Sequence, residues 1–283
     1  MQDLASVWVR AVGAAVGKVS PADLYQGRAF SEIRTAARIS NADLQIVSAG
    51  LGLVPATEEV PSYSLTVSDG SGSIRNWLEA RGAIPSDWWT VLTTEMGAPN
   101  PLSDLINSTS LDGVVLLALP ASYLGMVYQD LSQIAHACEG RLRIFTSEAG
   151  VRLLPDHLKK TAMPYDGRLE GLPDHAGTRT EFPHRALRHF VEKLGGHLLT
   201  LPQANAAVTS ALHGLQCRSI PKRLRATDSK ICDLIRANWV VSRGSSNKLL
   251  RVLRDDALVA CEQARFVALV QLVRGEMQQA GVS

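Results

Sequence analysis

Residues 44–68 carry the residue types from which a binding pocket is built. A short apolar segment, 44–47, breaks into small residues at Ser48 and Gly50, and an extended loop with Tyr63 follows. Glycine lets the backbone approach a ligand closely, and serine or tyrosine supplies a directed hydrogen bond. A strand that ends in this way is typical of a pocket at the carboxyl edge of a sheet. An ordinary exit from a strand, with the glycines serving the turn, is the alternative.

A second chemical feature is a basic segment between residues 218 and 254. Ten basic residues stand there against Asp228 and Asp233, so the segment carries +8 and the rest of the chain −6, within a net charge of +2. The ten are Arg218, Lys222, Arg223, Arg225, Lys230, Arg236, Arg243, Lys248, Arg251 and Arg254. Such a segment favours a polyanionic partner, most simply nucleic acid. A solvated charged helix face is the alternative.

The elements that must position the pocket are three short apolar runs, 44–48, 114–120 and 141–146. Flanking turn residues and brevity predict buried strands, and the helical pattern of 122–136 lies between the last two. This alternation predicts an α/β fold with a parallel sheet between helix layers, over residues 1–150. All three strands end in Ser, Pro or Gly, so we expect their loops to meet at one edge of the sheet.

The remainder divides into a loop-rich stretch, 151–183, and a helical basic part, 184–283. We interpret the loop-rich stretch as a lid or a linker. In the helical part, a helix from 228, a break with Gly244 and a second helix match a helix-turn-helix, although simple helical packing also fits. The residues that we expect to contact double-stranded DNA are Arg185, Arg188, Arg243, Ser246, Asn247, Lys248, Arg251 and Arg254.

Composition narrows the class of protein. No apolar run approaches the roughly 20 residues that span a bilayer, and Asp3, with no basic region before the first apolar stretch, makes the start a poor signal peptide. The four cysteines stand far apart, and the seven histidines form no HxxxH or HxH pair. We therefore expect a cytoplasmic, monomeric protein with no metal and no cofactor.

Several short motifs occur in an order that resembles a known family. They are Ala22-Asp23-Leu24-Tyr25, Phe30, Arg34, Ile46-Val47-Ser48-Ala49, Gly52-Leu53-Val54 and Tyr63-Ser64-Leu65-Thr66. This order resembles the YaaA-like peroxide-stress proteins and the core domain of archaeosine synthases, a group whose fold is similar to that of uracil-DNA glycosylase. The resemblance covers about residues 20–146. With its helical C-terminal part, the chain also resembles phage-defence DNA glycosylases that act on bulky modified cytosines.

The chain departs from the family in three places. No strand ending in a Cys or Ser pocket motif precedes Pro21, and Gly50 and Leu51 stand where the family often has Lys and an aromatic residue. The family's Tyr-Asp pair is Tyr63-Ser64 in this chain. The resemblance therefore implies a pocket without naming its ligand.

The resemblance and the basic segment together predict a DNA glycosylase. It would excise a modified cytosine, glucosylated hydroxymethylcytosine for example, and leave an abasic site, because no Lys is placed as a Schiff-base nucleophile. The expected catalytic carboxylates are Glu58, Glu59 and Asp166. For each of them, an ordinary acid at the protein surface is the alternative. The expected pocket residues are Ser48, Gly50, Tyr63, Tyr123, Ser147, Tyr165 and Arg168. The alternatives are a DNA-binding regulator with a ligand-sensing domain and an RNA- or nucleoside-modifying enzyme.

Overall fold

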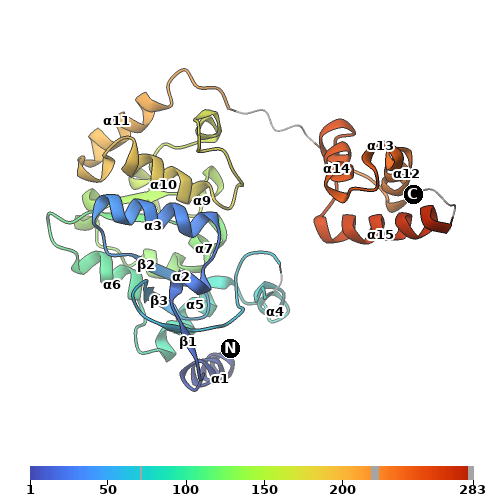
Figure 1. Cartoon of the computed structure of the whole chain (residues 1–283). Helices are drawn as coiled ribbons and strands as arrows, with labels where there is room; N and C mark the ends of the chain where they lie inside the picture. The colour runs from blue at the N-terminus through green and yellow to red at the C-terminus, as the bar shows by residue number, and fades with distance from the viewer. Residues whose placement is uncertain (71, 218–222, 280–283) are drawn as a thin grey trace. The chain divides into compact units, whose positions relative to one another are not determined.

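The computed structural model describes residues 1–70, 72–217 and 223–279 (Figure 1). The chain forms two compact units, Met1–Arg218 and Ser219–Ser283, each with its own hydrophobic core. Arg218 and Lys222 of the basic segment lie outside the described residues.

The first unit is mixed α/β, as the sequence predicts. Its α-helices are α1 (Gln2–Gly13), α2 (Pro21–Leu24), α3 (Arg28–Ser40), α4 (Arg75–Glu79), α5 (Pro85–Glu95), α6 (Pro101–Ser108), α7 (Ala121–Met126), α8 (Tyr128–Leu131), α9 (Glu148–Arg152), α10 (Phe182–Glu192) and α11 (Leu201–Ala211). Its 3-10 helices are η1 (His136–Arg141), η2 (Asp156–Thr161), η3 (Gly167–Gly171) and η4 (Gly196–Leu198). Its strands are β1 (Lys18–Val19), β2 (Gln45–Ser48), β3 (Gly52–Pro55), β4 (Val60–Pro61), β5 (Val115–Ala118) and β6 (Leu142–Phe145).

The three predicted strands are present as β2, β5 and β6, but their pairing differs from the expected parallel sheet. β5 and β6 pair in parallel, from Val115 opposite Leu142 to Ala118 opposite Phe145. β2 pairs antiparallel with β3 instead, because Gly52, at a φ of 71°, lets the chain fold straight back after β2. Within the described residues, each of these two sheets has two strands.

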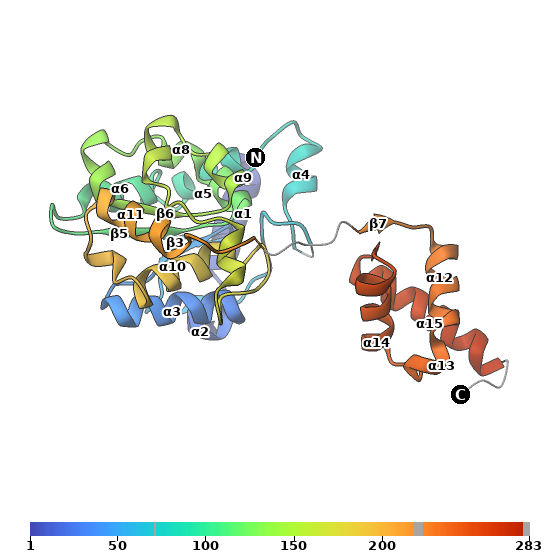
Figure 2. The same cartoon turned by 90° about the horizontal axis from the view of Figure 1, so that it is seen from above.

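Helices flank the strands of the first unit on two sides. Figure 2 shows α3 and α10 on one side of β5 and β6, and α5 and α8 on the other. The side chains of β6 explain this arrangement, because neighbouring residues of a strand face opposite ways. Ile144 belongs to the core cluster with Trp88 and Trp89 of α5, whereas Phe145 belongs to the cluster with Phe190 of α10.

α10 belongs to the first unit, not to the helical basic domain in which the sequence predicted it. The expected boundary at residue 184 is therefore wrong for this helix, and the loop-rich stretch also lies within the first unit. The physical reason is its apolar face: Ala186, Leu187 and Phe190 are buried against the cluster that includes Ala36 of α3. Its basic residues had suggested a polyanion-binding helix, but burial of this face decides where it packs.

The helical stretch that begins at Pro21 is interrupted. α2 begins after Ser20, whose hydroxyl accepts a hydrogen bond from the Asp23 amide, and it ends before Gly27, which has a φ of 107°. α3 ends at Ser40, and the next residue, Asn41, adopts the left-handed conformation that is common after a helix. Tyr25 therefore follows the end of α2, and α3 begins as a separate helix at Arg28 after Gly27.

The second unit is mainly helical. It contains β7 (Leu224–Arg225), α12 (Asp228–Ala237), α13 (Trp239–Ser242), α14 (Ser246–Arg251), a π-helical turn η5 (Val252–Asp256), β8 (Val259–Ala260) and α15 (Gln263–Gln279). The side chains of Ile231, Trp239, Leu249 and Phe266 share its core. β7 and β8 pair in parallel, which the sequence did not predict. Among the residues described in both units, no helix is long and apolar enough to cross a membrane.

Candidate functional site

The end of β2 is a hydrogen-bonded cluster of hydroxyl groups. Ser48 Oγ accepts the backbone amides of Gly50 and Leu51, at 3.2 and 2.9 Å, and makes a short hydrogen bond with the Tyr63 hydroxyl. Tyr63 in turn bonds Tyr25, with 2.7 Å between their hydroxyl oxygens. The serine that the sequence marked as a pocket residue therefore orients two tyrosines.

Two tryptophans hold the main chain that follows Ser48. Trp8 Nε1 donates to the Gly50 carbonyl at 2.7 Å, and Trp88 Nε1 donates to the Ala49 carbonyl at 2.8 Å. The close packing explains the glycine, because a Cβ at position 50 would lie 2.7 Å from the Tyr63 ring and 3.0 Å from the Trp8 ring. Gly50 thus serves the packing of Tyr63 and does not contact the cavity described below.

The end of β5 carries a second set of hydroxyls. The Tyr123 hydroxyl on α7 lies 3.4 Å from Thr66 Oγ1, and Ser122 Oγ lies 3.0 Å from Ser68 Oγ. Burial raises the pKa of Tyr63 and that of Tyr123, and in each case it outweighs the hydrogen bond that lowers the pKa. Both phenols therefore remain neutral hydrogen-bonding groups.

A cavity of about 470 Å³ is lined by residues of both β2 and β5. Its lining residues are Leu24, Tyr25, Gln26, Ala29, Phe30, Ile33, 44–47, 116–120, Tyr123, His184 and Leu187. None of these is Asp, Glu, Lys or Arg. The volume falls within the roughly 300–1,000 Å³ of small-molecule sites, and an apolar lining with a few polar groups is typical of them.

His184 is the one imidazole among these lining residues. Burial lowers its pKa to about 4, so the ring is neutral at neutral pH. Within the described structure, its buried Nδ1 has no hydrogen-bond partner. A buried polar atom without a partner is costly, and a ligand that reached this nitrogen would remove that cost.

The strands themselves add main-chain groups to the cavity wall. β2 pairs with β3 and β5 pairs with β6, and in the described residues neither strand has a second strand partner. Because 44–47 and 116–118 both line the cavity, one edge of each strand is free to offer N–H and C=O groups there. The cavity therefore suits an uncharged, flat molecule that stacks on aromatic rings and makes a few hydrogen bonds.

The three expected catalytic carboxylates do not line this cavity. Glu58 and Glu59 are exposed in the turn between β3 and β4. Asp166 caps η3 and pairs with Arg168, whose Nε lies 2.9 Å from Asp166 Oδ1. This pairing holds the pKa of the Asp166 carboxyl below its ordinary value, although burial acts in the opposite direction. Glu58 and Glu59 therefore lie in an exposed turn, and Asp166 is held by Arg168, so none of the three is placed to act on a molecule in the cavity.

Of the expected pocket residues, Tyr123 lines the cavity and the others have different surroundings. Tyr165 is buried and its hydroxyl lies 2.7 Å from His189 Nδ1, so it offers no surface to a base. Ser147 caps α9 through the Gly150 amide, which is the alternative that its position after a strand allows. Arg168 holds Asp166. The pocket assignments of Tyr165, Ser147 and Arg168 are therefore wrong for this cavity.

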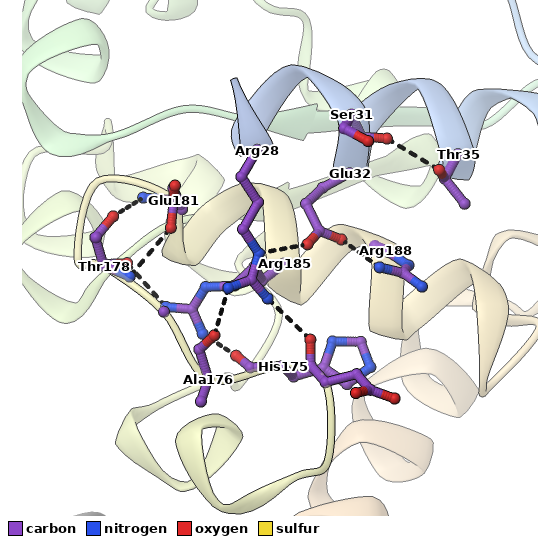
Figure 3. Close-up of polar contacts among 12 residues, drawn as sticks. Arg28, Ser31, Glu32, Thr35, His175, Ala176, Thr178, Glu181, Arg185 and Arg188 are labelled. Atoms are coloured by element: carbon purple, nitrogen blue, oxygen red, sulfur yellow. Dashed lines mark hydrogen bonds and ion pairs between the residues drawn. The ribbon is translucent and has the colours of Figure 1, made fainter. Parts of the chain in front are cut away.

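Arg185 and Arg188 are also not free for DNA. Arg185 is fully buried, where it pairs with Glu170 at 2.7 Å and donates to the carbonyls of His175 and Thr178. It ties the loop before α10 to the helix. Figure 3 shows this loop and Arg185 beside the α3 residues that carry the second ion-pair group. A buried, paired guanidinium contacts no phosphate, so the prediction for Arg185 is wrong.

The second group centres on Glu32 of α3, which is buried between two arginines. Its carboxylate lies 3.0 Å from Arg28 Nε and 2.9 Å from Arg188 Nη1 (Figure 3). Burial alone raises the pKa of Glu32, but the hydrogen bonds from Arg188 and Arg28 outweigh it and hold the pKa below its ordinary value. Arg188 also pairs with Glu192 at 2.7 Å. This network joins α3 to α10 beside the cavity.

The expected DNA contacts of the second unit stand at its surface. Arg243, Asn247, Lys248 and Arg251 are exposed, whereas Ser246 and Arg254 are half-buried. Lys248 and Arg251 follow each other by three residues on α14, on one face of the helix. This arrangement leaves their charged groups available to a polyanion.

No protein-family model, no curated protein and no solved structure matches the chain. The resemblance stated from the motifs therefore stays a prediction. Within the described residues, no group of three His, Cys, Asp or Glu side chains is arranged to hold a metal ion.

Sequence reasoning missed Tyr25, Phe30 and His184 as cavity residues. Tyr25 and Phe30 belong to the motifs of the resemblance, so their spacing was a signal. His184 had none, because its helix had been assigned to the other domain.

Proposed function

We propose that the chain is a DNA glycosylase whose first unit holds an extruded base and whose second unit binds the DNA backbone. The observation that supports it most is the uncharged cavity with three aromatic rings, Tyr25, Phe30 and Tyr123, and a neutral imidazole. An enzyme that removes a base must take it out of the stack and hold it by stacking and hydrogen bonds.

The proposal includes the finer fold assignment, a uracil-DNA-glycosylase-like core followed by a helix-turn-helix. Helices on both sides of β5 and β6 support the first part (Figure 2). For the second part, α14 with exposed Lys248 and Arg251 follows α12 and α13 after a turn at Gly244. Polar and basic residues on such a helix would meet phosphates or base edges.

The substrate that we propose is a modified cytosine, and hydrolysis would leave an abasic site. The cavity volume of about 470 Å³ exceeds what an unmodified pyrimidine requires, which supports a bulkier base. With no carboxylate in the lining, His184 and the hydroxyl groups are the residues that would orient the base and the attacking water.

The test is release of bases from a panel of four DNAs. One is unmodified, one contains uracil, one contains hydroxymethylated cytosine and one contains glucosylated cytosine. Released bases are identified by mass spectrometry, and abasic sites by alkaline cleavage. We expect release from one modified DNA, its loss in Ala29→Trp, which fills the cavity from α3, and its retention in Ala11→Trp, a matched change at an exposed position of α1. No release from any DNA would overturn the proposal.

A DNA-binding regulator is the second candidate, because no Asp or Glu lines the cavity. It predicts that DNA is bound without base release and that a small uncharged molecule changes the affinity for DNA. The same panel, read by binding as well as by release, separates the two functions.

A further inference from the structure

We propose that the second unit contains a phosphate-binding pocket built by Arg223, Arg225, Arg254 and Arg265. These four arginines line a cavity of about 410 Å³ together with Ala260, Cys261 and Glu262. Of the four, Arg254 is the residue that the sequence named as a DNA contact, Arg223 and Arg225 belong to the basic segment, and Arg265 lies outside it. The inference rests on the proposed DNA binding by this unit, and it names the group of the DNA that is held.

The backbone brings these side chains together from distant positions. Parallel pairing of β7 and β8 sets Arg225 opposite Ala260. Arg223 Nε donates to the Arg254 carbonyl at 2.7 Å, and Arg254 Nη2 donates to the Cys261 carbonyl at 3.3 Å. Arg265, on the first turn of α15, donates to the Ala226 carbonyl at 3.0 Å. The guanidinium groups of Arg223, Arg254 and Arg265 are therefore positioned before any ligand binds, which lowers the entropic cost of binding.

The three carboxylates near the pocket already have hydrogen-bond or ion-pair partners. Glu262 accepts the amides of Ala264 and Arg265, at 2.9 and 3.0 Å, and these bonds hold its pKa below the ordinary value. Arg223 pairs with Asp255 at 3.0 Å, and Arg265 Nε pairs with Asp228 at 2.7 Å.

Arg225 and Arg254 give the pocket its excess of positive charge. Neither has an acidic partner in the part of the chain that the structure describes, and Arg225 is exposed at the rim. Four guanidiniums against three carboxylates leave the pocket positive.

The chemistry of this pocket fits a phosphate group. Guanidinium forms paired, charge-assisted hydrogen bonds with phosphate oxygens, and several guanidiniums around one cavity match a tetrahedral anion. The phosphate has two possible sources in DNA: an internal phosphodiester or a terminal phosphate at a strand end.

The experiment uses the full chain and two duplexes of one sequence, which end in a 5′-phosphate or a 5′-hydroxyl. Affinities are measured against salt for the wild type, the double variant Arg225→Gln/Arg254→Gln and the control Lys230→Gln, an exposed change outside the pocket. We expect the double variant to lose about tenfold or more in affinity and the salt slope to fall by about 2, against about 1 or less in the control.

The affinities for the two duplexes distinguish a terminal phosphate from an internal phosphodiester. A preference of the wild type for the 5′-phosphate that the double variant loses assigns a terminal phosphate, whereas equal weakening on both duplexes assigns a phosphodiester. Titration with inorganic phosphate, followed by nuclear magnetic resonance, tests the pocket even where DNA is not bound. Wild-type behaviour of the double variant towards both DNA and phosphate would overturn the inference, and base release, measured separately, would still decide the proposed function.

Discussion

The two units of this protein handle charge in opposite ways. Residues 219–283 contain eleven basic and six acidic residues, a net charge of +5, which leaves −3 for residues 1–218. In the first unit Arg185 is fully buried and paired, and the cavity is lined without a charged side chain. In the second unit Arg243, Lys248 and Arg251 are exposed, and the cavity is lined by arginine.

Under the proposed function, this difference means that the first unit holds the base of the DNA and the second unit holds its backbone. An uncharged cavity suits a base, whose recognition depends on stacking and on a few hydrogen bonds, whereas a basic surface suits the phosphate backbone. A cluster of arginines therefore does not by itself mark a binding surface. Arg185 and Arg225 have the same side chain, but burial and an acidic partner make the first a structural residue.

The largest effect of a single substitution is expected where a buried charge loses its partner. Arg185→Gln leaves Glu170 and two carbonyls without their donor and should destabilise the first unit by about 3–5 kcal/mol. Hydrogen exchange read by mass spectrometry reports each unit separately, and the second unit should be unchanged. The control Arg251→Gln should leave both units stable. Normal stability with weakened DNA binding in Arg185→Gln would reverse our assignment.

Acid should unfold the first unit before the second. Burial lowers the pKa of His184 and of His189 to about 4, against 6.5 in an unfolded chain. Between these values the unfolded state binds protons that the folded state does not, so stability falls as the pH drops from about 6.5 to 4. Each histidine contributes a loss of about 3 kcal/mol.

Residues 219–283 contain no histidine, so this loss is confined to the first unit. Hydrogen exchange at pH 7 and pH 4.5 checks it. Equal acid sensitivity of both units would contradict the role of the buried histidines.

Removing the exposed cations of α14 should weaken DNA binding by a smaller free energy. Lys248→Gln and Arg251→Gln each take away one cation that would neutralise a phosphate, so each should reduce the salt slope by about 1 without favouring any DNA sequence. Fluorescence anisotropy over a range of salt concentrations measures this slope. Arg152→Gln, an exposed change of the same charge in the first unit, serves as the control and should leave the slope unchanged.

The smallest effect is expected from a single hydroxyl behind the cavity. Tyr63→Phe removes the oxygen that joins Ser48 to Tyr25 and should cost about 1 kcal/mol of stability in the first unit. Binding of a free base should weaken because Tyr25 loses its orientation. Tyr128→Phe, at an exposed tyrosine, should change neither quantity.

The sequence predicted the strands better than their pairing. Apolar runs bounded by turn residues correctly located β2, β5 and β6, and the helix expected from residue 228 begins there as α12. The hairpin of β2 and β3 depends on the backbone angle at Gly52, which residue type allows but does not require.

The sites were harder to predict because their residues meet only in the folded chain. Asp166 is held by Arg168, two residues away, although its type suggested catalysis. His184 reaches the cavity because the apolar face of α10 packs against α3. The arginine pocket joins Arg223 to Arg265 across a parallel strand pair with no periodic signal in the sequence.

The most direct test of the division between the units is hydrogen exchange of the full chain, free and bound to the DNA of the panel that binds most tightly. Our account predicts protection at 246–254 in the second unit and also at 24–30 and 116–123 around the cavity of the first. Free base should protect only the cavity segments. Protection by DNA in the second unit alone, with the cavity segments unchanged, would contradict the claim that the first unit holds the base.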